Sequence, residues 1–123
     1  MNELLLIIAA YLIGSIPTAV WVSRAFFGID IRNYGSGNAG ATNTYRVLGK
    51  KWGTFVMTGN MLKTIVAVKL AFFIPEAFDN ELYLINLQLG LGLAAVLGHI
   101  FPIWAEFRGG KGVASLFGMG LGI

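Results

Sequence analysis

Apolar residues dominate four stretches of this chain, and polar residues gather between them. The stretches cover residues 4–22, 52–75, 83–104 and 113–123. At about 1.5 Å per helical residue, each of the first three is long enough to cross a hydrocarbon core of about 30 Å, and the fourth covers about half of it. The pattern predicts an all-α polytopic membrane bundle. It has three full transmembrane helices and a truncated fourth, and forms one integral membrane domain over residues 1–123.

Composition supports lipid as the solvent. Charged residues make up 12% of the chain and hydrophobic residues 56%, with a mean hydropathy of +0.72, whereas about a quarter of a soluble domain is charged. The start, Met1-Asn2-Glu3, lacks the basic residues of a cleaved signal peptide, so we interpret the first stretch as a retained span. With no cysteine, one histidine and scattered acids, we expect no metal site. We also expect no cofactor, no nucleic-acid partner and no obligate protein partner.

The charged residues between the spans predict the orientation. The first connection is basic, with a single acid, Asp30, against five basic residues: Arg24, Arg32, Arg46, Lys50 and Lys51. The second connection is acidic and holds Glu76, Asp79 and Glu81. The positive-inside rule places the first connection in the cytoplasm and the acidic one outside. The amino terminus is then outside, and the chain returns to the cytoplasm after the third span.

A glycine-rich stretch, GSGNAGATN at residues 35–43, lies in the basic connection. Its glycine spacing is that of dinucleotide-binding folds, but no strand is predicted before it and no acid follows at residues 55–60, so we exclude that function. A flexible linker is the simplest alternative. The interleaved polar residues favour a phosphate cradle, in which backbone N–H groups turn inward to bind an anion. Thr42 or Asn43 would cap a helix running through Arg46, whose guanidinium suits phosphate.

A second stretch, RGGKGVAS at residues 108–115, follows the third span on the same predicted face. Gly109, Gly110 and Gly112 surround Lys111, without the spacing of a Walker A loop. Lys111 either anchors the chain at the membrane surface or contacts an anion, and the flanking glycines favour the anion.

Three polar residues inside the spans also need an explanation. Lys63 lies near the middle of the second span, where an unpaired charge costs at least about 3 kcal/mol, so we expect it to face a polar interior. Lys69 lies on another face of the same helix and is expected to extend outward to the membrane surface. His99 ends the third span, and a structural hydrogen-bonding role is favoured over catalysis.

These motifs resemble those of the bacterial acyl-phosphate:glycerol-3-phosphate acyltransferases. The resemblance rests on YLIGSIPTA at 11–19, DIRNYGSGNAGATNTYRVLGKK at 30–51 and GHIFPIWAEFRGGKGVA at 98–114. It implies an amino-terminal portion of a multi-pass enzyme of the bacterial inner membrane, without the family's third cytoplasmic motif. It also exposes two departures, since Asn60 and Thr64 occupy positions where family members commonly carry Asp and Gly. Lys63 then lacks a counter-charge.

The resemblance implies transfer of a fatty acyl group from acyl phosphate to the 1-hydroxyl of glycerol 3-phosphate, giving lysophosphatidic acid and phosphate. Ser36 and Arg46 would be the catalytic residues, with His99 and Lys63 in support. No base is evident to make Ser36 a covalent nucleophile, so direct attack by the glycerol hydroxyl is favoured. The phosphate- and substrate-binding residues implied are Gly37, Asn38, Gly40, Thr42, Asn43, Gly109, Gly110, Lys111 and Gly112.

Two other functions stay open at this point. Glycine-rich breaks near a lysine also occur in anion transporters and channels, although their sites lie near the bilayer midplane rather than at its rim. An inactive fragment with a packing role is the third interpretation. Binding of glycerol 3-phosphate would separate the enzyme from the fragment.

Overall fold

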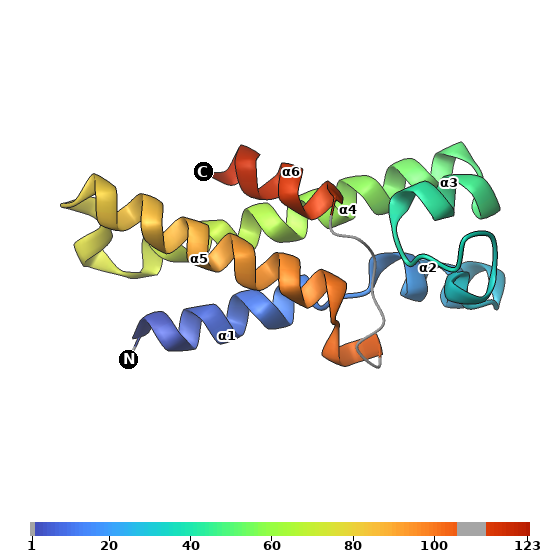
Figure 1. The fold of residues 1–123 in the computed structure, drawn as a ribbon, viewed down its shortest axis with the longest axis horizontal. Helices are drawn as coiled ribbons and strands as arrows, with labels where there is room; N and C mark the ends of the chain where they lie inside the picture. Colours follow the sequence, from blue (N-terminus) through green and yellow to red (C-terminus); the bar gives the residue numbers. More distant parts are fainter. Residues whose placement is uncertain (1, 106–112) are drawn as a thin grey trace.

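The computed structural model describes residues 2–105 and 113–123, and within these ranges it contains helices and turns but no strand (Figure 1). Among the described residues, three segments are long and apolar enough to cross a membrane: Asn2–Phe27, Lys50–Phe73 and Glu81–Ile100. The predicted all-α membrane bundle is therefore confirmed. Its helices are α1 (Asn2–Gly14), α2 (Thr18–Phe27), α3 (Ala41–Leu48), α4 (Lys50–Lys69), α5 (Glu81–Ile100) and α6 (Val113–Gly122). Its short 3₁₀ turns are η1 (Ile31–Asn33), η2 (Leu70–Phe73), η3 (Pro75–Phe78) and η4 (Ile103–Ala105).

The first span is interrupted, which corrects the continuous helix expected over residues 4–22. Helix α1 ends at Gly14 and α2 begins at Thr18. Pro17 causes the break, because its ring cannot donate a backbone hydrogen bond and it disfavours the helical conformation at Ile16. The Ser15 hydroxyl donates to the Tyr11 carbonyl at 2.8 Å within this break. The first span thus exposes backbone carbonyls inside the bundle.

The bounds of the other spans also differ from those expected over 52–75 and 83–104. The second continues from α4 through η2, and the third ends at Ile100 because the chain turns before Pro102. At the start of α5, the Asn80 side chain accepts from the Tyr83 amide at 3.1 Å and so caps the helix. Lys69 is exposed, with its ammonium 5.5 Å from the Phe72 ring centre. This exposure agrees with the outward placement expected for Lys69.

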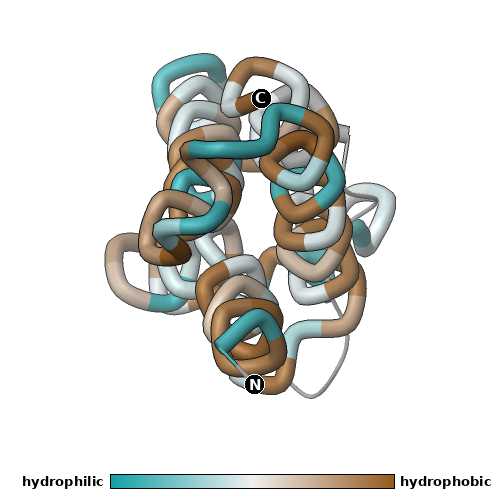
Figure 2. The backbone as a smooth tube through the Cα atoms, turned by 90° about the vertical axis from the view of Figure 1, so that its left-hand side faces the viewer, coloured by the Kyte–Doolittle hydropathy of each residue, from teal (hydrophilic) through white to brown (hydrophobic). Residues whose placement is uncertain are grey.

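Small residues let the spans pack closely. The core between α1, α4, η2 and α5 includes Ala10, Ala67, Leu91 and Ala95, all fully buried. Large apolar side chains lie instead on the outside, where Leu93 and Leu97 of α5 are 51% and 53% exposed. Figure 2 shows the bundle end-on, from the end that holds the amino terminus, with hydrophobic residues on each of its helices. This arrangement suits lipid as the surroundings of the bundle.

The two ends of the bundle differ in chemistry. Helix α3 and the end of α2 lie at one end, and the amino terminus and the turns η2 and η3 lie at the other (Figure 1). Beside α3, the Trp52 ring packs against Phe26 and Phe27 with centroids 5.0 and 5.4 Å away, and the Lys51 ammonium lies 5.4 Å from the Trp52 ring centre. Aromatic and basic residues gather in this way at membrane interfaces. The α3 end carries the basic residues of the first connection, whereas the acids Glu76, Asp79 and Glu81 lie at or next to the turns of the other end.

Candidate functional site

The glycine-rich loop at residues 35–40 is a compact structure rather than a linker. Gly35 and Gly37 have φ values of +57° and +78°, which side chains rarely adopt. A Cβ on Gly35 would also overlap the Asn43 side chain. Beyond the loop, Val56 of α4 shares a hydrophobic cluster with Ala39. The loop is thus held in one conformation against the start of α4.

Asn43 holds this loop together from inside. Its side chain is 1% exposed, and its Oδ1 accepts from the Ser36 amide at 3.0 Å. Its Nδ2 donates to the carbonyls of Tyr34 and Asn38, both at 2.9 Å, and to that of Ile31 at 3.3 Å. One side-chain amide therefore joins η1, the glycine loop and α3.

This geometry corrects the expected capping and the expected open cradle. Helix α3 begins after Gly40 without a side-chain cap, so neither Thr42 nor Asn43 caps it. The Ser36 amide is taken by Asn43, and the Gly37 amide donates to the Tyr34 carbonyl at 2.9 Å. Local hydrogen bonds use these amides, so they are not turned toward an anion as an open nest requires.

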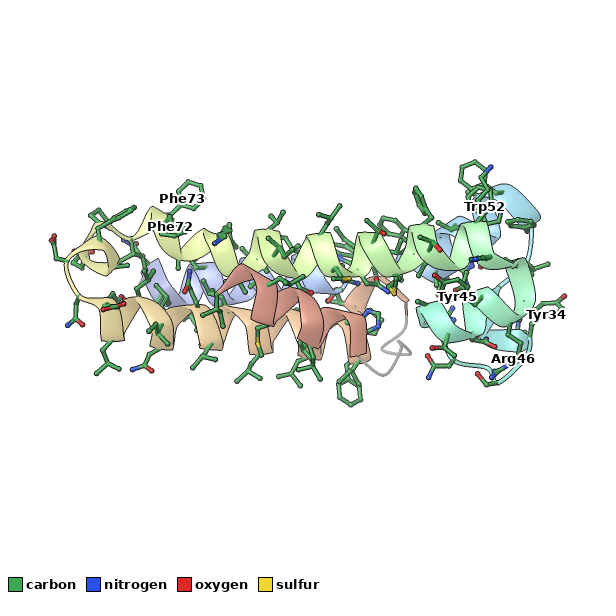
Figure 3. The ribbon with its side chains drawn as sticks, turned by 90° about the horizontal axis from the view of Figure 1, so that it is seen from above. Tyr34, Tyr45, Arg46, Trp52, Phe72 and Phe73 are labelled. Carbon is green, nitrogen blue, oxygen red and sulfur yellow. The ribbon has the colours of Figure 1, made fainter. Side chains whose placement is uncertain are left out.

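Ser36 and Arg46 remain available for a ligand. Both are exposed, and Figure 3 shows Arg46 at the α3 end of the bundle, on the opposite side of α3 and α4 from Trp52. The Ser36 oxygen accepts from the Asn38 amide at 3.4 Å, and no base in the described ranges receives its proton. Within those ranges Arg46 makes no ion pair or hydrogen bond. The catalytic roles of Ser36 and Arg46 stay predictions.

Sequence reasoning missed a second charged group at this end. Asp30 accepts from Arg32 Nη2 at 2.7 Å and from Arg24 Nη2 at 3.0 Å, and the Arg32 side chain is only 3% exposed. Arg32 Nε and the Arg32 amide each donate to Asp30 Oδ1 at 3.0 Å. The side-chain hydrogen bond from Arg32 holds the pKa of Asp30 well below its ordinary value of 3.8. From the sequence, these residues were interpreted only as part of the charge of the first connection.

Asp30→Asn is expected to destabilise the protein at neutral pH by about 2 kcal/mol, because hydrogen bonds to charged groups contribute about that much. Since the pKa of Asp30 is lower folded than unfolded, its carboxylate stabilises the fold above pH 3.8. That stabilisation is lost as the pH falls from 3.8 toward the lowered value. Thermal melts of the wild type and Asp30→Asn between pH 7 and pH 3 measure this loss. We expect the difference between their melting temperatures to become smaller toward pH 3. A constant difference would contradict the ion-pair role.

A separate polar centre lies inside the bundle. Lys63 is buried, as expected, and its Nζ lies 2.7 Å from the Ile16 carbonyl in the break and 3.1 Å from His99 Nδ1. His99 is buried and its Nδ1 contacts Lys63, and the structural role favoured for it stays a prediction. The Asn60 side chain is buried with its Oδ1 unpartnered, whereas Thr64 Oγ1 donates to the Asn60 carbonyl at 3.1 Å.

Part of the predicted site cannot be placed. Gly109, Gly110, Lys111 and Gly112 lie outside the described residues. The expected meeting of the two glycine-rich loops therefore stays a prediction. Among the described residues there is no group of three or more His, Asp or Glu side chains close enough to hold a metal ion.

Comparisons with known proteins give the chain a family. Residues 4–123 match the family model described as glycerol-3-phosphate acyltransferase. The glycerol-3-phosphate acyltransferase of Enterococcus faecalis is 47% identical over 97% of this chain and 52% of its own length. Glycerol-3-phosphate acyltransferase 2 of Bacillus cereus is 50% identical over 94% of this chain and 54% of its own length. The chain thus spans about half the length of these curated relatives.

Two solved structures have the same fold. One is the crystal structure of PlsY (YgiH), an integral membrane glycerol 3-phosphate acyltransferase, in its glycerol 3-phosphate form. It is 42% identical, with a TM-score of 0.79, over 97% of this chain and 56% of that one. The other is its lysophosphatidic acid form, 39% identical with a TM-score of 0.79 over 99% of this chain and 57% of that one.

Proposed function

The chain belongs to the glycerol-3-phosphate acyltransferase family, and from this premise we propose that the protein transfers a fatty acyl group from acyl phosphate to the 1-hydroxyl of glycerol 3-phosphate. The products are lysophosphatidic acid and inorganic phosphate. The main support is an exposed guanidinium, Arg46, on the helix that follows the glycine loop, at one end of a membrane bundle. The related PlsY structures are a glycerol 3-phosphate form and a lysophosphatidic acid form, which fit one substrate and the product of this reaction.

The proposed chemistry is charge neutralisation and positioning. Both substrates carry phosphate, and two unit charges about 4 Å apart repel by about 4 kcal/mol at an effective dielectric near 20. Arg46 offsets this repulsion by pairing with a phosphate, and Ser36 orients the same group from the loop. The glycerol hydroxyl then attacks the acyl carbon directly, the bond between that carbon and the phosphate oxygen breaks, and the hydroxyl proton leaves with the released inorganic phosphate.

The second glycine-rich motif is proposed to bind glycerol 3-phosphate through Lys111 and the glycines around it. Of the first motif, Gly37, Asn38, Gly40 and Thr42 shape the wall around the reacting phosphate. The basic residues of the first connection support an orientation with both motifs in the cytoplasm and the amino terminus outside. The protein would then lie in the bacterial inner membrane, with the acyl chain of the donor remaining in lipid.

The donor is tested with membranes that carry this chain, alone or joined to the part of the Enterococcus faecalis relative that it does not cover (the joined protein). We expect the joined protein to form lysophosphatidic acid from acyl phosphate and none from acyl-CoA. We expect the product in inverted vesicles, whose cytoplasmic face is outward, when glycerol 3-phosphate is added outside. Product from acyl-CoA alone would overturn the donor, and product only in right-side-out vesicles would overturn the orientation.

Arg46→Ala provides the matched variant for this assay. Its loss is expected to lower kcat/KM at least about a hundredfold, because the substrate phosphate loses its charged partner. Because Arg46 is exposed and bonds to none of the described residues, the melting temperature should stay unchanged. Lys50→Ala is the control, since Lys50 is also an exposed cation at this end of the bundle. Equal activity in the two variants would reassign Arg46 to a general surface charge.

A further inference from the structure

Lys63 joins all three spans at one point. It belongs to α4, the Ile16 carbonyl lies in the break of the first span, and His99 ends α5, with distances of 2.7 and 3.1 Å from the Lys63 ammonium. Lys63 is 8% exposed, yet no carboxylate of the described residues lies within ion-pair distance of it. The Lys63 ammonium therefore has two neutral partners, the Ile16 carbonyl and a ring nitrogen of His99. The second partner restricts where the His99 ring can carry its proton.

The contact determines which nitrogen of His99 carries the proton. In its charged form, the lysine side chain has three hydrogens and no lone pair, so it can only donate. His99 Nδ1 must then accept, which leaves the single proton of the neutral ring on Nε2. His99 Nε2 bonds to none of the described residues, and Asn60 Oδ1 is the one fully buried side-chain polar atom in those ranges without a partner. No described residue therefore competes for the Nε2 hydrogen.

The residues that follow His99 are attached to the first span as well. The Tyr11 hydroxyl donates to the Phe101 carbonyl at 2.6 Å, and Trp104 Nε1 donates to the Leu12 carbonyl at 3.2 Å. Tyr11 and Leu12 lie about one helical turn before Ile16, whose carbonyl contacts Lys63. The end of α5, which leads in sequence toward the second glycine-rich motif, is thus fixed in direction by the first span.

We propose that Lys63 is a positioning residue that fixes His99 as its Nε2–H tautomer, so that His99 donates a hydrogen bond to a phosphate oxygen of the substrate. The tautomer follows from the contacts of Lys63 in its charged form. The phosphate oxygen as acceptor rests on the proposed function, because it needs a phosphate-bearing substrate near the end of α5. His99 is then a donor and not a general base.

Nitrogen NMR of the histidine ring tests the tautomer without any activity, and the single histidine of the chain makes the assignment unambiguous. In ¹⁵N-histidine-labelled protein in lipid nanodiscs, we expect a protonated Nε2 and an unprotonated Nδ1. In Lys63→Met, which keeps an unbranched side chain but no donor, we expect a mixture of both tautomers. Lys63→Arg restores a donor and is expected to return the single tautomer. A protonated Nδ1 in the wild type, or an unchanged ring in Lys63→Met, would overturn the proposal.

If Lys63→Met does not fold, the wild type and Lys63→Arg still decide the tautomer. The donor role is tested in the joined protein with His99→Gln, which keeps an N–H near the Nε2 position, and His99→Asn, whose amide is shorter. We expect His99→Asn to raise the KM for glycerol 3-phosphate about tenfold with little change in kcat, and His99→Gln to raise it much less. Equal KM values would overturn the donor role. Failure of the wild-type joined protein to turn over would count against the proposed function, while the NMR result would stand.

Discussion

Replacing Asn43 with alanine is expected to lower the free energy of unfolding by about 3 kcal/mol and to release the glycine loop. The wild-type side chain makes four hydrogen bonds from a fully buried position. Alanine leaves the Ser36 amide and the Asn38 carbonyl without this partner, whereas the carbonyls of Ile31 and Tyr34 keep their backbone donors. Each buried polar group left unpaired costs about 1–3 kcal/mol. Because the loop is partly exposed, water recovers some of these bonds, which keeps the total toward the lower end.

Hydrogen exchange at the Ser36 amide gives the most local readout of this change. The amide donates to Asn43 Oδ1 in the wild type, so we expect slow exchange there and fast exchange in Asn43→Ala. Thr42→Ala is the matched control, because Thr42 is exposed, adjoins Asn43 and makes no side-chain hydrogen bond within the described ranges. Its exchange and melting temperature should equal those of the wild type. Similar exchange at Ser36 in both variants would show that the loop is held by other contacts.

Asn43→Asp separates hydrogen bonding from shape. The aspartate has nearly the same volume, and its oxygen can still accept from the Ser36 amide. At neutral pH it cannot donate, so it would face three carbonyl oxygens with a negative charge. We expect this variant to be less stable than Asn43→Ala, and an intermediate stability would contradict the donor role of Nδ2.

The spans and their polar ends were predictable because hydrophobicity and charge are local properties of the sequence. Pro17 is a local signal for the break in the first span, but the length of the apolar stretch favoured one span over residues 4–22. The burial of Lys63 was predictable from the cost of a charge in lipid. Its partner was not, because the Ile16 carbonyl becomes available only once the helix breaks and packs beside α4.

The hydrogen bonding of the glycine loop could not be predicted from the sequence for a different reason. Gly, Ser, Asn and Thr are the residues of an anion-binding nest and equally those of a loop that bonds to itself. Only the fold shows that Asn43 points into the loop and accepts from the Ser36 amide that a nest would offer to phosphate. The Asp30–Arg32 pair was missed for a related reason, since two residues so close in sequence gave no sign that Arg32 would be buried.

Gly98→Ala is expected to destabilise the bundle by about 3 kcal/mol, although it adds a single methyl group. A Cβ at Gly98 would overlap the Tyr11 carbonyl of α1 and lie 2.8 Å from the Ser15 amide. Both are backbone atoms, so one helix has to move, and overpacking of this kind costs about 1–3 kcal/mol even where side chains can adjust. Gly14 of α1, which faces α5, is restricted in the same way, because a Cβ added there would overlap the Ala95 backbone. The first and third spans thus touch through glycine, as closely packed membrane helices do.

Gly90→Ala is the matched control on the same helix, because a Cβ at Gly90 would have no atom within 4 Å. There the methyl group only favours the helix, and we expect a stabilisation of about 0.5–1 kcal/mol. Thermal melts of the two variants in nanodiscs should therefore shift in opposite directions. Since α1 leads directly into Ile16, Gly98→Ala should also loosen the contact with Lys63, and the histidine ring should then show both tautomers. A Gly98→Ala protein as stable as the wild type would mean that the first and third spans are not in backbone contact in the membrane.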